Sequence, residues 1–229
     1  MKCRKWVTRD YFLILRKKNS FHNFILIVSV IFSLYLNSSI VDISFKEIFG
    51  ICLFVFTYSL FYIFNDIRYT TKVEDKKREI PCKSIVLLSI FVLTPLNVIW
   101  LKFNTTLAPI WILIFSIFMV HNLFYTLRFI TNPLLHLLKY IILGKLLLLE
   151  EKVGLPLWFI SSVFFIVAWE FKKYKKYSYG NKPLMISLVL FIFGGFLLLN
   201  SEIEKFFLSL IVLYIGNFIA KQLVWRARK

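Results

Sequence analysis

The sequence predicts an all-α fold, a polytopic bundle of about eight transmembrane helices that forms a single domain over residues 1–229. Composition is the first observation. Of the 229 residues, 59% are hydrophobic and 19% aromatic, more apolar surface than a soluble core of this size can hide. The second observation is that apolar segments of roughly 17 to 21 residues, long enough to cross about 30 Å of hydrocarbon as helices, recur along the chain. The third is an alternation of basic and nearly neutral loops between those segments.

The apolar segments follow one another with only short polar stretches between them, so no separate soluble domain or long linker is expected. Most prolines stand at or near a predicted helix start, where a missing backbone N–H is tolerated; Pro109 and Pro183 are examples. In order, the predicted helices cover residues 21–37, 48–65, 84–101, 108–127, 132–149, 154–170, 184–200 and 204–224.

The net charge of +17 is explained by topology. Lysine and arginine residues are concentrated in the N-terminal arm (residues 1–20), in the loops 65–83 and 171–182, and in the C-terminal tail. The alternate loops contain few basic residues, so the positive-inside rule predicts an integral membrane protein with both termini in the cytoplasm. Basic loops beside apolar helices contact anionic membrane lipids, and we expect no nucleic-acid partner.

The loop after the second predicted helix opens with an unusual Asn-Asp pair, Asn65 and Asp66. A carboxylate at the end of an apolar helix is costly and indicates a functional site. Mg²⁺ keeps several waters and needs only one or two protein carboxylates when a substrate phosphate supplies other oxygens. Arg68, Lys72 and Arg78 follow at once, and such cations suit a diphosphate.

At these residues the chain resembles the UbiA-type membrane prenyltransferases, whose first aspartate-rich motif reads Asn-Asp-x-x-Asp-x-x-x-Asp at the cytoplasmic end of the second transmembrane helix. Tyr62, Asn65 and Asp66 stand where that pattern begins. Tyr69 and Val73 occupy the places of the second and third aspartates. Glu74 and Asp75 lie just beyond the last one.

Two later stretches are also similar to the family. "YTLRFITNP" at 125–133 stands where members carry a Tyr-Ser/Thr pair with basic residues. "AWEFKKYKKYSYGNKPL" at 168–184 coincides with the second acidic motif: Glu170 matches, but Tyr174 and Lys176 stand where acids are expected. Two predicted helices follow this loop, where the family normally has three.

The resemblance implies a nine-helix bundle with a central cavity, in which Mg²⁺ helps a polyprenyl diphosphate lose pyrophosphate and a lipophilic or aromatic acceptor captures the prenyl group. The tail is expected in an apolar tunnel that opens laterally to lipid. Asn65 and Asp66 are the catalytic candidates. The metal candidates are Asp66, Asn65, Glu170, Asp75 and Glu74; the diphosphate candidates are Arg68, Lys72, Arg78, Lys172, Lys173 and Lys176; the substrate-contact candidates are Tyr62, Tyr69, Arg128, His136, Lys139 and Tyr174.

Other interpretations remain open. The acids of the first loop can simply pair with neighbouring lysines, and the lysines of the second can be topogenic. The chain can accordingly be a catalytically inactive relative that binds lipid or assists assembly. A small transporter is a third alternative, for which charged residues near the bilayer midplane and broken helices are typical.

Overall fold

The computed structural model describes residues 17–37, 44–69, 83–147, 155–172 and 182–226. All regular structure in these residues is helical, and the eight predicted helices are all present. Their bounds are α2 Lys17–Leu36, α3 Phe45–Tyr69, α4 Lys83–Phe103, α5 Ala108–Leu123, α6 Arg128–Leu147, α7 Leu157–Lys172, α8 Lys182–Leu198 and α9 Ile203–Arg226, with 3₁₀ turns at Thr105–Leu107 and Tyr125–Leu127.

Three helical stretches of the described chain are long and apolar enough to cross a membrane. They are Thr105–Leu123, Arg128–Leu147 and Ile203–Gln222. The apolar parts of four other helices are shorter: Asn23–Leu36, Leu87–Lys102, Leu157–Phe171 and Lys182–Leu198. Length and composition therefore support a membrane protein with transmembrane helices.

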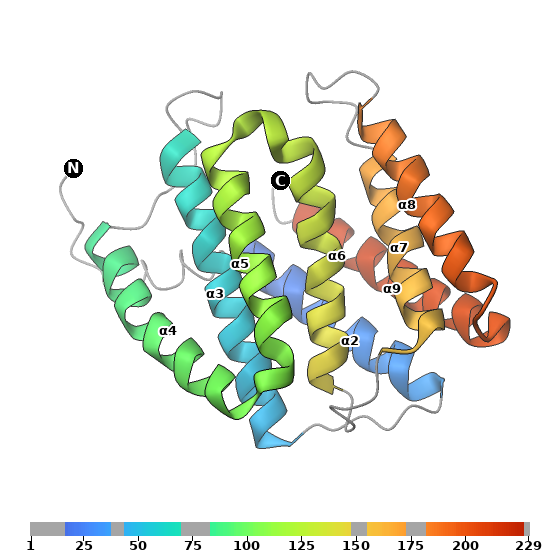
Figure 1. Cartoon of the computed structure of the whole chain (residues 1–229), viewed down its shortest axis with the longest axis horizontal. Coiled ribbons are helices and arrows are strands. Elements are labelled where there is room, and N and C mark those ends of the chain that lie inside the picture. The colour runs from blue at the N-terminus through green and yellow to red at the C-terminus, as the bar shows by residue number, and fades with distance from the viewer. Residues whose placement is uncertain (1–16, 38–43, 70–82, 148–154, 173–181, 227–229) are drawn as a thin grey trace.

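Helix α6 is the central element. It packs against α2, α3, α5, α7 and α8, and 67% of its apolar window is buried, compared with 33% for α5 and for α9. Figure 1 shows α3, α5, α6 and α7 running alongside one another, with α4 at one margin and α8 at the other. The C-terminal ends of α3, α5 and α7 lie at the same end of the bundle, the upper end in this view.

Helices α2 and α9 pack closely side by side, obliquely behind the others in Figure 1. Gly216 of α9 makes this approach possible, because a Cβ there would lie 1.7 Å from Ser29 Oγ and 2.6 Å from Ser29 Cβ. One turn further along α2, buried hydroxyls join three helices: Ser33 Oγ donates to Ser209 Oγ at 2.7 Å, which lies 2.7 Å from Ser162 Oγ. The contact thus combines a close backbone approach with satisfied polar groups.

The turn between α5 and α6 differs from the prediction. The sequence predicts that the fourth helix ends at residue 127 and that the fifth begins at residue 132. In the structure, α5 ends at Leu123 and α6 begins at Arg128. Phe124 is extended (φ −117°, ψ 100°), and Thr131 Oγ1 donates to the carbonyl of Leu127 at 3.1 Å. Hydropathy could not show this break, because Phe124 and Leu127 continue the apolar run through the turn.

Candidate functional site

A buried carboxylate lies near the C-terminal end of α7. Glu170 is only 5% exposed, and its partners come from two other helices. Its Oε1 accepts hydrogen bonds from Lys221 Nζ at 2.8 Å and from Asn217 Nδ2, both on α9. Its Oε2 lies 3.4 Å from Nδ1 of His136 on α6. Both carboxylate oxygens are therefore engaged, as a buried acid requires.

A buried lysine follows on α6, about one helical turn from His136. Lys139 is 4% exposed, and its Nζ donates to Asn23 Oδ1 of α2 at 2.6 Å. The same ammonium lies 5.5 Å from the ring centroid of Tyr58 on α3, and it interacts electrostatically with Glu170. An ammonium has three N–H donors, so one amide oxygen and one aromatic face compensate its burial only in part.

We call Glu170, His136, Asn217, Lys221, Lys139 and Asn23 the charged cluster. It holds two lysines and one carboxylate, so its net charge is positive. The two lysines differ in solvent exposure: Lys139 is buried, whereas the Lys221 side chain is 50% exposed. A ligand that approaches from outside the bundle therefore meets Lys221 first. Positive charge in an apolar setting favours an anionic partner.

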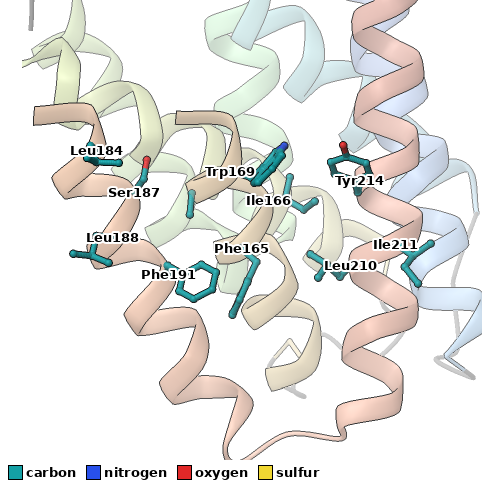
Figure 2. A pocket seen from close by; sticks show the side chains of 11 residues that line it. Phe165, Ile166, Trp169, Leu184, Ser187, Leu188, Phe191, Leu210, Ile211 and Tyr214 are labelled. Atoms are coloured by element: carbon teal, nitrogen blue, oxygen red, sulfur yellow. The ribbon is translucent and has the colours of Figure 1, made fainter. Parts of the chain in front are cut away.

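An apolar groove lies beside the cluster. Helix α7 forms its floor and α8 and α9 form its walls, with a volume of about 590 Å³, within the range of small-molecule sites. Figure 2 shows Trp169 and Tyr214 at the same end of this groove, with the indole nitrogen and the phenol oxygen toward that end. Their ring centroids are 6.3 Å apart. The groove is lined by Phe165, Ile166, Ala168, Trp169, Leu184, Ser187, Leu188, Phe191, Leu210, Ile211 and Tyr214.

The groove and the cluster share two helices. On α7, Ile166 lines the groove and Glu170 follows four residues later. On α9, Tyr214 lines the groove, and Asn217 and Lys221 follow three and seven residues later. Positions at these spacings share one helix face. No residue of the cluster lines the groove, but along both helices the cluster follows the end of the groove that Trp169 and Tyr214 mark.

Several predicted site residues lie on the last turns of α3, which reaches Tyr69, so residues 66–69 are helical and the predicted start of the loop at residue 65 is wrong. The structure places Tyr62, Asn65, Asp66, Arg68 and Tyr69 there, at the same end of the bundle as the C-terminus of α7. Their side chains are outside the described structure, so their predicted roles stay predictions. Tyr58 belongs to the same helix and contacts Lys139, and Asp66 lies about 12 Å further along the axis.

Three other predicted residues are described on α6, and the rest lie elsewhere in the chain. His136 and Lys139 both belong to the charged cluster. Arg128 lies about 12 Å along α6 from His136, and its Nε donates to the carbonyl of His121 at 3.3 Å. Lys172 ends α7, with its side chain undescribed. Outside the described residues lie Lys72, Glu74, Asp75, Arg78, Lys173, Tyr174 and Lys176.

Sequence reasoning did not single out three members of the cluster, Asn23, Asn217 and Lys221. The sequence did indicate Asn217, because it stands among apolar residues of its helix, where a polar side chain needs a partner. Asn23 gave no such indication, because it follows the polar residues Asn19, Ser20 and His22. Lys221 was grouped with the basic C-terminal tail. Its four-residue spacing from Asn217 would have placed it on the inner face of the helix.

The described residues offer little for a metal ion. They contain no group of three or more His, Cys, Asp and Glu side chains able to hold one. Glu170, a predicted metal ligand, has a lysine, a histidine and an amide as its neighbours. A divalent cation would have to compete with Lys221 for its carboxylate.

Comparisons with protein-family models, curated proteins and solved structures find no match to the chain.

Proposed function

We propose that the chain is a multi-pass membrane protein and a divergent UbiA-type prenyltransferase, which transfers a polyprenyl group from its diphosphate, or acts on a polyprenyl phosphate, with a lipophilic or aromatic acceptor. The observation that supports this proposal is that an apolar groove and a charged cluster share α7 and α9, with the cluster toward the C-terminal end of both helices. A polyprenyl phosphate has the same two parts, a long apolar tail and one anionic end.

Prenyl transfer requires fixed positive charge near the diphosphate leaving group. When the bond between the prenyl carbon and the diphosphate oxygen breaks, negative charge grows on the diphosphate, and cations held in a dry site stabilise it. In the described structure Lys139 is such a buried cation, and the half-exposed Lys221 adds positive charge at the entrance. In this proposal Asn65 and Asp66 hold Mg²⁺, which supplies further charge neutralisation when bound. Glu170 stays outside that ligand set while it is paired with Lys221.

The proposed topology has eight membrane-spanning helices, with both termini and the two connections, from α3 to α4 and from α7 to α8, on the cytoplasmic side. The ends of α3 and α7 at one end of the bundle support it, because those ends lead into the two loops. Single cysteines in each loop, labelled with an impermeant reagent in sealed vesicles, test it. Labelling of either loop from the side opposite the N-terminus would refute both the topology and the site.

Turnover is tested with purified full-length protein, labelled farnesyl and longer prenyl diphosphates, and Mg²⁺, followed by measurement of pyrophosphate and of extracted lipids. We expect pyrophosphate release that Asp66→Asn abolishes. Glu204→Gln is the matched control, because it removes a carboxylate at the start of α9 and should leave the rate unchanged.

Binding tests the site apart from turnover. Calorimetry should show that Mg²⁺ alone binds weakly and that Mg²⁺ and farnesyl diphosphate strengthen each other's binding by the same factor, as linkage requires. Asp66→Asn should abolish this coupling, and Glu74→Gln should reduce it less. Equal affinities with and without Mg²⁺ would refute the metal assignment.

The second candidate is a catalytically inactive relative that binds a lipid phosphate. Two observations favour it: Tyr69 replaces an aspartate of the family motif, and the Glu170 carboxylate is already engaged by Lys221. Ligand binding without any pyrophosphate release from any prenyl diphosphate would establish this candidate over the transferase.

A further inference from the structure

We propose that the charged end of the groove binds the phosphate of a single-chain isoprenoid phosphate, and that the Glu170 carboxylate occupies this phosphate site when no ligand is bound. The isoprenoid nature of the ligand rests on the proposed function. The role of Glu170 does not: Glu170 is an internal competitor of the ligand phosphate, held by the same donors.

The donors around Glu170 are those that a phosphate requires. Lys221 and Asn217 donate to one carboxylate oxygen, and His136 faces the other. A phosphate monoester carries more negative charge and one more strong acceptor oxygen than a carboxylate, and it forms charge-assisted bonds with the same groups. A ligand phosphate can therefore take the place of the carboxylate without any new donor.

Lys221 is the donor that a ligand can reach from outside, whereas Asn217 is buried. The Lys221 side chain is half exposed, whereas that of Glu170 is 6% exposed, so the lysine is the member of the pair that a ligand reaches first. Trp169 and Tyr214, whose polar atoms lie toward this end of the groove, flank the approach (Figure 2). Such amphipathic rings suit the boundary between a lipid tail and its headgroup.

Charge along α9 fixes the orientation of the ligand. At the start of this helix Glu204 accompanies an ion pair between Glu202 and Lys205 (2.6 Å), which leaves one net negative charge there, and Lys221 lies near the end of the helix. An anionic headgroup is repelled at the first end and attracted at the second. Lys139, about one turn from His136, adds positive charge inside the bundle on the same side. The phosphate therefore belongs at the Lys221 end and the tail in the groove.

The test uses calorimetry of the purified full-length protein in detergent, without Mg²⁺, and two probes with one tail: farnesyl phosphate and farnesol. The wild type should bind the phosphate more tightly than the alcohol. Glu170→Gln should tighten phosphate binding about five-fold, the equivalent of releasing one ion pair, and leave farnesol unchanged. Unchanged farnesol binding also shows that the variant is folded. Lys221→Gln should remove the preference for the phosphate.

Two matched controls separate this site from general effects of charge and bulk. Glu204→Gln makes the same charge change at the other end of α9 and should not alter phosphate affinity. Leu188→Trp should weaken binding of both probes, because Leu188 lines the groove and is 60% exposed. Ile192→Trp should weaken neither, because Ile192, on the same helix and 61% exposed, is not part of the groove lining.

Several results would overturn the inference. One is that the wild type binds farnesyl phosphate and farnesol with equal affinity. Another is that Glu170→Gln binds the phosphate as the wild type does or more weakly. A third is that Glu204→Gln tightens phosphate binding as much as Glu170→Gln does. Oleoyl lysophosphatidate is the comparison ligand, and binding as tight as that of farnesyl phosphate would replace the isoprenoid by an ordinary membrane lipid. If Glu170→Gln tightens binding but no diphosphate is turned over, the transferase fails and the site stands. If turnover occurs and Glu170→Gln weakens phosphate binding, the transferase stands and the proposed role of Glu170 fails.

Discussion

The buried lysine of α6 provides the sharpest stability prediction. Asn23→Leu removes the amide that accepts the hydrogen bond from Lys139 Nζ at 2.6 Å and leaves an ammonium that is 4% exposed beside the Tyr58 ring. A hydrogen bond to a charged group contributes about 1.5 to 3 kcal/mol. Double-mutant cycles between membrane helices reach at most about 1.7 kcal/mol. We therefore expect Asn23→Leu to lower the free energy of unfolding by about 1.5 to 2 kcal/mol.

The partner substitution should behave differently. Lys139→Met keeps the length of the side chain but removes a buried charge, so the cost of desolvating that charge disappears. We expect a loss below about 1 kcal/mol or a small increase in stability, and the double variant should be close to Lys139→Met alone. Lys145→Met, on the same helix with a partly exposed lysine, is the control and should stay within about 0.5 kcal/mol of wild type.

Unfolding of the purified protein in mixed micelles, followed by tryptophan fluorescence as the fraction of denaturing detergent rises, measures all four variants. A coupling energy of about 1 to 2 kcal/mol between Asn23 and Lys139 is the expected outcome. Additive effects of the two substitutions, or an Asn23→Leu variant as stable as wild type, would refute the claim that this amide compensates the buried ammonium.

Two further substitutions test the contact between α2 and α9 by the same unfolding measurement. Gly216→Ala should lower the free energy of unfolding by about 1 to 3 kcal/mol, because the new Cβ would overlap Ser29. Gly195→Ala is the control: its Cβ would meet no atom within 4 Å, so this variant should be as stable as wild type or slightly more stable. Equal effects of the two substitutions would contradict the close approach of α2 and α9 at Gly216. Ser209→Val should cost about 1 to 2 kcal/mol through the loss of two buried hydroxyl contacts, and Ser116→Val at an exposed position should cost almost nothing; a neutral Ser209→Val would show that these contacts contribute no stability.

The helices could be predicted from the sequence because each contains an apolar segment, and three stretches of the described chain are long enough for a membrane crossing. What hydropathy could not predict are contacts between helices. The break at Phe124 depends on hydrogen bonds across the turn, such as that from Arg128 Nε to the carbonyl of His121, rather than on a change of hydrophobicity. Helix α6 has the lowest hydropathy of the three membrane-length stretches, and it is the most buried one, because its polar groups find partners in the interior.

The candidate site was accessible to sequence reasoning only in part. Glu170 was predicted from its position in a family-like motif, and His136 and Lys139 were among the candidates for substrate contact. That α9 would supply Lys221 and Asn217 to the same carboxylate could not be foreseen, because the pairing joins residues 47 and 51 positions apart. No local pattern reports such a contact. It depends on how α7 and α9 pack.

The packing of α2 against α9 also has a consequence for biogenesis. The first and last described helices are neighbours in space, so the ribosome delivers one side of this contact long before the other exists. While the chain is being made, the hydroxyl of Ser33 has no Ser209 to meet, and Glu170 has neither of its α9 donors. Such long-range contacts form slowly and leave the intermediate open to mispairing. Nascent chains arrested before α9 should therefore depend on the insertion machinery or a holding chaperone until the last helix arrives.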